Sequence, residues 1–189
     1  MSQSSREKLL DVTFDVVYRY GYQGAATAAI LKQAGVPKGS MYHHFGSKKG
    51  MVLAMIEERL IPKVRAFFDF GMRPGSSAIE TLEHTMYKIA HNRMLVLHGC
   101  PLHRLMFEME AQDSEIAQIC EAEFEHLRET LAALLAVGMQ EGSITETDPK
   151  ALAGYIIASS WGFLSRPMAG SSKEQFLQDS QRLLESIRP

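Results

Sequence analysis

Cysteine is scarce in this sequence, and long apolar runs are missing. Only Cys100 and Cys120 occur, so the disulfide framework of small secreted domains is excluded and we expect free thiols. No stretch approaches the roughly 18 apolar residues of a membrane-spanning helix. The first residues, MSQSSREKLL, carry charges where a secretory signal would be apolar. We therefore expect a soluble cytoplasmic protein that makes no membrane contact.

Strand-like alternation of apolar and polar residues is also missing, as are internal repeats and low-complexity tracts. Apolar residues recur instead at helical spacing, and 46% of the 189 residues are hydrophobic, which is enough to bury a core. The sequence thus predicts an all-α fold. The expected helices span 4–21, 27–34, 37–45, 48–61, 79–98, 101–111, 114–141, 148–166 and 172–188.

Capping residues mark several of these ends. Ser4 and Glu7 have the spacing of a capping box, Thr27 is expected to cap the second helix, and Gly35 to stop it. Pro62 should bend or end the fourth helix. Further caps are Asp148 before Pro149 and Ser172 before Gln175.

Charge divides the chain unevenly. Residues 1–65 carry ten Lys/Arg and five acids, a net +5, which leaves −7 for the rest because the total is −2. Two short helices joined by AGVPKG inside a three-helix unit are typical of a helix-turn-helix. We therefore predict a DNA-binding domain over 1–50, a connecting helix over about 48–62, and a ligand-binding and dimerisation domain over 51–189.

The stretch GVPKGSMYHHFGSKKG carries the chemistry for holding a polyanion. On a short helix after Pro37, Met41 and Phe45 are expected to point inward. Gly39 lets a partner approach the backbone closely, and the helix N-terminus offers unpaired N–H groups. The side expected to face outward carries Lys38, Gly39, Ser40, Tyr42 and His43.

Lys48 and Lys49 begin the next helix, where cations oppose the helix dipole. We expect a group outside the fold to favour them, and DNA phosphate is the simplest candidate. The alternative is an ordinary solvated face. A nucleotide-binding P-loop is excluded, because GVPKGS has neither the residue order nor a preceding strand.

The stretch TAAILKQAGVPKGSMYHHFGSKKGMVLAMI, within residues 6–62, resembles the DNA-binding domain of TetR-family transcriptional regulators. The resemblance implies an all-helical homodimer that binds a palindromic operator and a small effector. It implies that Thr27, Tyr42 and Lys48 contact phosphate. The base- or backbone-contacting positions would be Lys38, Gly39, Ser40 and His43. The family often has an acid where this chain has Gly50.

Residues 151–165, ALAGYIIASSWGFLS, contain no charge and are too few to span a bilayer. They suit a helix buried on most sides. The helix expected over 114–141 has an apolar stripe from Ile116 to Leu135. Pairing both helices with their copies in a second chain would give a four-helix bundle, as the family resemblance also implies. A purely intramolecular core is the alternative.

An effector pocket should be apolar with few polar groups. Seven of the eleven methionines follow residue 65, and Met86, Met94, Phe107 and Trp161 are candidate lining residues. Each of them could equally be an ordinary core residue.

Cys100 directly precedes Pro101, which favours the first position of a helix and places the thiol at the N-cap. His98, His103 and Arg104 could add positive charge, as an accessible electrophile sensor needs. Gly99 and Cys100 also resemble a motif with a reactive cysteine in the TetR branch that includes the N-ethylmaleimide reductase repressor. The alternatives are an inert buried cysteine or a metal site, but the spacing H-x-C-x-x-H is a weak zinc pattern. Cys120 is expected in the core.

These patterns together predict a ligand- or electrophile-responsive transcriptional regulator, with repression as the family's direction of control. We expect no enzyme activity, metal or cofactor, since no acid pair, nucleophile motif or cofactor loop stands out. The alternative is a helical small-molecule-binding or electrophile-processing protein without a DNA function.

Overall fold

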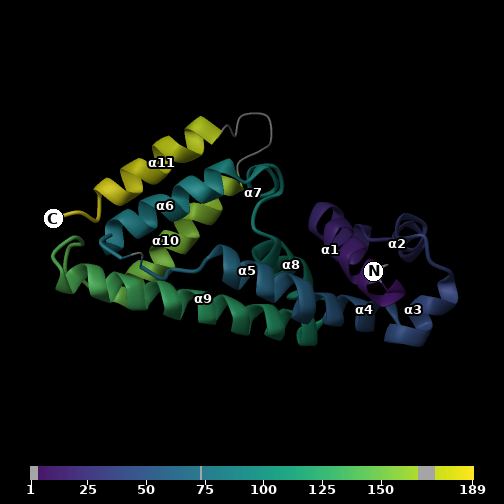
Figure 1. The fold of residues 1–189 in the computed structure, drawn as a ribbon. Helices are drawn as coiled ribbons and strands as arrows, with labels where there is room; N and C mark the ends of the chain where they lie inside the picture. The colour runs from purple at the N-terminus through teal and green to yellow at the C-terminus, as the bar shows by residue number, and fades with distance from the viewer. Residues whose placement is uncertain (1–3, 73, 166–172) are drawn as a thin grey trace. The chain divides into compact units, whose positions relative to one another are not determined.

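The computed structural model describes residues 4–72, 74–165 and 173–189, and every regular element in these ranges is a helix. The predicted all-α fold class is therefore confirmed. The chain divides into two compact units, and each is described here by itself (Figure 1). The first unit runs to Phe67 and includes Pro101–Glu121, and the second contains Phe68–Cys100 and the chain from Ala122 onward.

The first unit is built around α1, which packs against α2, α3, α4 and α8. Its core contains Leu9, Leu10, Ile30, Met51 and Val52, each at most 1% exposed. Burial of one such side chain favours folding by about 1.5–3 kcal/mol. The helices of this unit are α1 (Ser5–Gly24), α2 (Thr27–Ala34), α3 (Lys38–Phe45), α4 (Lys48–Met55), η1 (Ile56–Leu60), α5 (Ile61–Phe67) and α8 (Pro101–Met109).

The ends of the first helices follow the predicted signals in part. Ser4 caps α1 as predicted, because its hydroxyl accepts the N–H of Glu7. Gly21 has the non-helical angles φ 76° and ψ 176° and interrupts the helix as predicted, and a short helical segment follows this kink to Gly24. Thr27 was wrongly predicted as a cap: Ala26 holds that position, with no side-chain hydrogen bond, and Thr27 is the first helical residue. Gly35 stops α2 in the left-handed conformation, as predicted.

The helical segment predicted over 48–61 extends to Phe67 and changes from α-helix to π-helix and back to α-helix. After α4 ends at Met55, the π-helix η1 follows and leads directly into α5. Pro62 lies in the first turn of α5 and does not end the helical path, so of the two predicted effects of Pro62 only the ending of the helix is contradicted. Proline cannot donate an N–H to the preceding turn and its ring clashes there, and a wider π turn just before it accommodates both effects.

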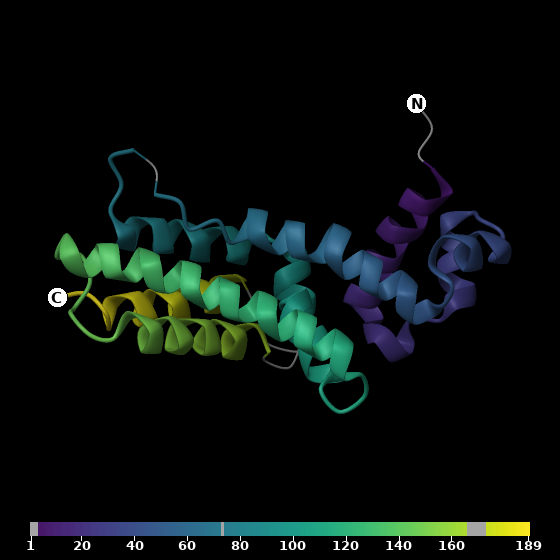
Figure 2. The same ribbon diagram turned by 90° about the horizontal axis from the view of Figure 1, so that it is seen from below.

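The second unit contains α6 (Ala78–His91), α7 (Arg93–His98), α10 (Pro149–Leu164) and α11 (Lys173–Glu185). The long helix α9 (Ser114–Gln140) begins in the first unit and belongs to the second from Ala122 (Figure 2). Within the second unit, α6 packs against α7 and α11, and α10 packs against α7 and α11. Asp148 caps α10, with Pro149 at its first position, as predicted. The predicted helix end at Arg166 and the cap at Ser172 lie outside the described residues.

The helix predicted over 79–98 is in fact two helices. Asn92 ends α6 and caps α7, where its side-chain oxygen accepts the N–H groups of Met94 and Leu95 at 3.0 and 3.1 Å. A side chain that satisfies two free N–H groups favours a new helix start over continuation of the old one. The apolar periodicity runs through this break, and so the sequence pattern alone did not mark it.

The apolar stripe of α9 is buried within the single chain. Ile116, Cys120, Leu131, Leu134 and Leu135 are each at most 5% exposed. The prediction that this stripe meets a second chain was therefore wrong, and the alternative of an intramolecular core holds for it. Cys120 lies in the core as predicted, at 0% exposed.

Candidate nucleic-acid interface and effector cavity

The helices α2 and α3 form a tip whose outer surface carries the predicted DNA-binding residues. Met41 is 1% exposed and anchors α3 in the unit. Tyr42 on the opposite side is 52% exposed, and Lys38, Gly39 and His43 are exposed as well. Ser40 and Thr27 are half-buried. The structure thus leaves six of the seven predicted residues at least partly exposed, with Thr27 at the first position of α2 and the other five on α3, which α2 contacts.

Both of these helices begin without a side-chain cap. Ala26 precedes α2 and Pro37 precedes α3, and neither side chain accepts a hydrogen bond from its helix. The first N–H groups of a helix need partners, and a phosphate placed there supplies acceptors where the dipole favours negative charge. The Lys38 ammonium lies 5.7 Å from the Tyr42 ring centroid, which holds a cation beside this surface.

The charge around the tip has one sign. No Asp or Glu occurs from residue 16 to residue 56, while Arg19, Lys32, Lys38, Lys48 and Lys49 all lie in this range. Lys32 is exposed in the last turn of α2 and was not among the predicted contact residues. The acid-free run is the sequence signal that could have identified it, because a polyanion is repelled by carboxylates and attracted by lysines.

The seventh predicted residue, Lys48, has a partner inside the protein. Its Nζ donates to the Tyr22 carbonyl at 2.6 Å and lies 4.5 Å from the Tyr22 ring centroid. Burial lowers the pKa of Lys48, and the nearby Glu108 carboxylate opposes that effect. Lys48 therefore ties the start of α4 to the end of α1.

Lys49 also has internal partners. Its Nζ pairs with Asp113 at 2.7 Å and Glu115 at 2.8 Å, and these contacts raise the pKa of Lys49 to about 12. The expectation that only a group outside the fold could favour the two lysines was wrong. Acids about 65 residues later in the chain offset the unfavourable helix dipole, and no local sequence pattern reveals them.

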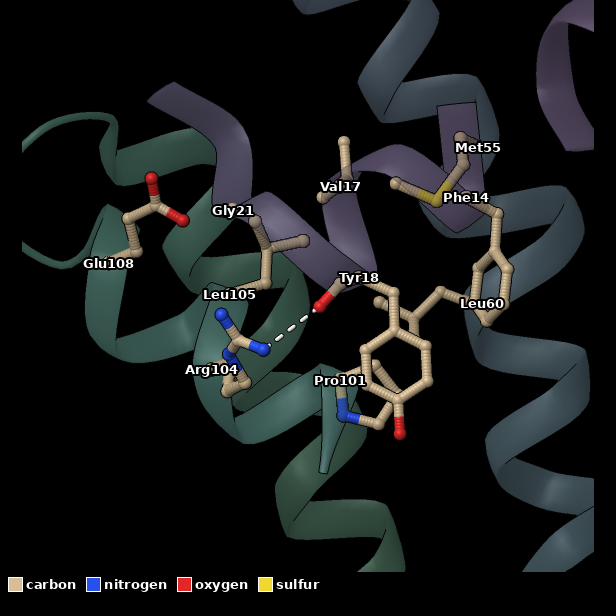
Figure 3. A pocket seen from close by; sticks show the side chains of 10 residues that line it. All are labelled: Phe14, Val17, Tyr18, Gly21, Met55, Leu60, Pro101, Arg104, Leu105 and Glu108. Carbon is tan, nitrogen blue, oxygen red and sulfur yellow. Dashed lines mark hydrogen bonds between the residues drawn. The ribbon is translucent and has the colours of Figure 1, made fainter. Parts of the chain in front are cut away.

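Glu108 binds the backbone of α1 at the Gly21 kink (Figure 3). Its two oxygens accept the N–H groups of Tyr22 and Gln23, each at 2.8 Å. One turn earlier on α8, the Arg104 guanidinium donates to the Tyr18 carbonyl at 3.0 Å. These charged groups border a small recess between α1 and α8, but the backbone of α1 already engages them both. They position the helix that leads into the tip.

Gly50 keeps the start of α4 close to α3. A Cβ at this position would lie 2.2 Å from the Phe45 carbonyl oxygen, so a side chain cannot be placed there without movement. The Ser47 hydroxyl still caps α4 by accepting the Gly50 N–H at 3.0 Å. The departure from the family's usual acid therefore leaves the helix cap in place and allows a tight α3–α4 connection.

The second unit contains an apolar cavity between α6, α9 and α10. It encloses about 480 Å³ of space not filled by protein atoms, part of it open to solvent, and all its lining residues are uncharged. Its few polar groups are occupied: the Ser160 hydroxyl donates to the Ile156 carbonyl and the Thr85 hydroxyl to the Thr81 carbonyl. The lining includes Leu82, Met86, Cys100, Leu131, Ile157 and Trp161.

Three of the five predicted effector residues line this cavity, and two do not. Met86, Cys100 and Trp161 come together there. Met94 is half-buried on α7 outside the lining, and Phe107 is 62% exposed on α8, where its ring contacts that of His103. Phe68, Phe70 and Leu127 complete the aromatic and aliphatic wall, and sequence reasoning missed them.

Cys100 faces the cavity and is not accessible at the surface. The residue is 2% exposed, and neither cysteine forms a disulfide. Burial lowers the pKa of His103, which disfavours the charged imidazolium form. The Arg104 guanidinium is engaged by α1. The predicted solvent-accessible setting for Cys100 was therefore wrong, and the thiol lines the cavity instead.

Metal binding and membrane spanning find no support in the part of the chain that the structure describes. No group of three or more His, Cys, Asp or Glu side chains that could hold a metal ion occurs among the described residues. None of the helices in those residues is both long and apolar enough to cross a bilayer.

Two family models match this chain. The model described as "Bacterial regulatory proteins, tetR family" covers residues 9–55, which include α2 and α3. The model described as "Tetracyclin repressor-like, C-terminal domain" covers residues 77–175, which is over half of the chain.

Individual relatives agree with these matches. The chain is 26% identical over 71% of its length to an uncharacterised HTH-type transcriptional regulator of Lactococcus lactis, covering 69% of that protein. It is 25% identical to the HTH-type transcriptional repressor DhaR of a Mycobacterium species, over 97% of this chain and 92% of the other. The solved structure of reduced Escherichia coli NemR has a TM-score of 0.84 at 20% identity, with 97% of each chain covered, and shows a shared fold.

Proposed function

Since the chain belongs to the TetR family of bacterial regulatory proteins, we propose that it is a one-component repressor released from a palindromic operator by a small effector. It binds as a homodimer and acts in the cytoplasm, where the DNA lies. The observation that carries this proposal is the α2–α3 tip, which combines two uncapped helix starts with exposed cations and a 41-residue range free of acids.

Each residue of the tip has a proposed role. Thr27 and Tyr42 contact phosphates beside the two helix starts, and Lys48 adds a third phosphate contact, since an ammonium has three donors and one of them holds Tyr22. The exposed side of α3 enters the major groove. Its contacts to bases and the adjoining backbone come from Lys38, Gly39, Ser40 and His43.

A gel-shift assay on the chain's own upstream DNA at two salt concentrations tests the proposal. Lys48→Ala should weaken binding evenly across sequences and reduce the salt slope by about one, because one phosphate contact is lost. Ser40→Ala should change sequence preference instead. Absence of any operator preference in the unaltered protein would favour the alternative, a small-molecule-binding protein without a DNA function, which the apolar cavity alone would serve.

The outer side of α10 is the proposed contact between the two copies. Ala151, Tyr155, Ala158 and Gly162 are exposed at helical spacing on one side of this helix, which carries no charged residue after Lys150, and Tyr155 is 56% exposed. An exposed apolar stripe with small residues allows a second helix to approach closely. Two recognition helices held in this way would enter successive major grooves about 34 Å apart.

The cavity of the second unit is the proposed effector site, with Met86, Cys100 and Trp161 in its wall. An electrophilic effector that enters it would reach the Cys100 thiol directly. In that case Cys100→Ser should prevent operator release by an electrophile, while Cys120→Ser, also a buried cysteine, should not. Unchanged release in the Cys100→Ser protein would show that the effector acts without bonding to sulfur.

A further inference from the structure

The apolar cavity has a neighbour on the surface of the same unit. A groove runs between α6 and α11 and encloses about 970 Å³ of space that is open to solvent. Tyr87, Leu177 and Leu184 give it apolar walls. We call it the α6–α11 groove.

Met86 belongs to the linings of both the cavity and the α6–α11 groove. Leu82, Thr85 and Ile89 of α6 face the cavity, whereas Glu83 and Tyr87 face the groove. The Met86 side chain is 4% exposed, and its sulfur lies 3.9 Å from the Ser160 hydroxyl oxygen inside the cavity wall. An unbranched thioether side chain changes rotamer easily, so it can open a passage between the two spaces.

The groove contains a buried hydroxyl that lacks a partner. Ser180 is 2% exposed, and its Oγ makes no hydrogen bond within the described residues. Ser180 also lines the groove. Burying a hydroxyl without a hydrogen bond is unfavourable. Oγ itself is covered, so a ligand reaches it only when neighbouring side chains move, and a ligand group that then donates to or accepts from Oγ removes that cost.

The charged groups of the groove disfavour an anionic ligand. Arg188 donates to Glu83 at 2.5 Å, so its charge is engaged. Glu185 lines the groove as a second carboxylate and accepts from Gln181 at 2.9 Å. The groove therefore has two acids for one base, which suits a neutral head group that can hydrogen-bond.

We propose that the effector is an elongated neutral amphipathic molecule, with its apolar end in the cavity and its hydrogen-bonding head at Ser180 in the α6–α11 groove. Met86 is the gate between the two. This inference rests on the proposed function, because it assigns the chemical class of the effector of that regulator.

The fluorescence of Trp161 provides a direct test. It is the single tryptophan of the chain and it lines the inner cavity, so its emission reports on cavity occupancy rather than on binding to the open surface. The probe is 1-octanol, and octanoate is the charged analogue of equal chain length. Octanol should shift Trp161 emission in a saturable way, and octanoate should bind about ten-fold more weakly because its charge meets two carboxylates.

Variants separate the two parts of the proposed site. Ser180→Ala should weaken octanol binding about five-fold through one lost hydrogen bond. Without octanol, its melting temperature should stay equal or rise, because the removed hydroxyl has no partner. Met86→Ala should give a several-fold faster stopped-flow response of Trp161. Met94→Ala is the matched control, since that methionine of the same unit lines neither space.

The proposal is overturned if octanol leaves Trp161 unchanged up to its solubility limit. It is also overturned if Ser180→Ala binds octanol normally, or if the Met86→Ala and Met94→Ala proteins respond alike. Operator retardation, measured on the same preparations without probe, reports the proposed function separately. Retained operator binding with a silent Trp161 would remove this inference alone, whereas lost operator preference in the unaltered protein would remove the DNA function.

Discussion

Gly39 lies inside the helix α3, where glycine is usually unfavourable. It is exposed, and a Cβ built there would have nothing within 4 Å. Alanine should therefore stabilise the folded protein by roughly 0.5–1 kcal/mol. A DNA backbone or base edge that approaches this glycine would meet the added methyl group. We predict that Gly39→Ala raises the melting temperature and at the same time weakens operator binding in a gel shift.

The opposite responses are what makes Gly39→Ala informative. A loss of both stability and binding would mean that the folded tip was damaged. A gain in stability with unchanged operator binding would place the DNA contact elsewhere on α3.

His103 should make the protein sensitive to mild acid. Burial lowers its pKa in the folded state below the ordinary 6.5, so the unfolded chain binds more protons in that range. The stability linked to this residue is therefore present above pH about 6.5 and is lost as the pH falls toward the folded pKa. His103→Gln should reduce the fall in melting temperature below pH 6.5, and exposed His126→Gln should not. Identical pH profiles for both variants would contradict the prediction.

Exposure was predictable from sequence where it depends on the spacing of residues along a helix, while the roles of the exposed residues stay predictions. Lys38, Ser40 and His43 follow Pro37 within two turns, and the spacing of Met41 and Phe45 indicates which side is buried. Phe107 was assigned to a pocket because of its residue type alone. A residue type carries no information about which helix side faces a cavity on another element, and Phe107 is exposed.

At the scale of elements, Gly21 and Gly35 differ in how an added side chain would fit, and also in ψ, which is 176° at Gly21 and 36° at Gly35. Both have positive φ, at 76° and 65°. A Cβ at Gly21 would lie 2.5 Å from Oε2 of Glu108, whereas one at Gly35 would meet nothing within 4 Å. Gly35→Ala should therefore cost about 1–2 kcal/mol of unfolding free energy from the backbone alone. Gly21→Ala should cost more, because its backbone conformation is essentially limited to glycine and because the new Cβ also displaces the carboxylate that accepts two N–H groups.

Glu108→Ala provides the control for this pair. In that background the extra cost of Gly21→Ala over Gly35→Ala should shrink, and a double-mutant cycle by urea unfolding measures the difference. Additive effects would show that Glu108 and the α1 kink are energetically independent.

Helix boundaries were predictable where a cap or a breaker acts locally. Ser4, Gly35 and Asp148 mark ends that the structure contains. Asn92 interrupts an apolar run that contains neither glycine nor proline. Its capping hydrogen bonds can be identified in the structure but not from the sequence pattern. The bonds from Glu108 to α1 join residues 85 and 86 positions apart, a separation at which periodicity gives no information.

At the scale of the whole molecule, the outer side of α10 should set the oligomeric state. Ala158→Glu places a carboxylate in the middle of its exposed apolar stripe, and a charge buried at an interface without a partner is strongly unfavourable. We predict monomers in sedimentation experiments and a large loss of operator affinity, because the two recognition helices are no longer joined. Ala133→Glu is the control, an exposed alanine on α9. A dimeric Ala158→Glu protein would place the contact on another surface.

The all-helical class and the family were predictable because many weak helical signals and one specific motif agree. The assignment of α9 to a contact between copies failed for a physical reason. An apolar stripe shows that a helix side is buried, but not whether its cover comes from the same chain or from a second one. The predicted boundary at residue 50 between a DNA-binding domain and a ligand-binding domain stays a prediction. The two compact units are defined by contacts within the chain, and contacts do not show which function each part has.

The π-helix η1 between α4 and α5 sets the angular register of the residues that follow it. An α turn has 3.6 residues and a π turn holds about one more, so removing one residue from Ile56–Leu60 would restore continuous α winding. The side chains before and after the deleted residue would then keep their directions around the helix axis, and the helix would be one residue shorter. Homologues that wind this segment as an uninterrupted α-helix should accordingly show a one-residue alignment gap here.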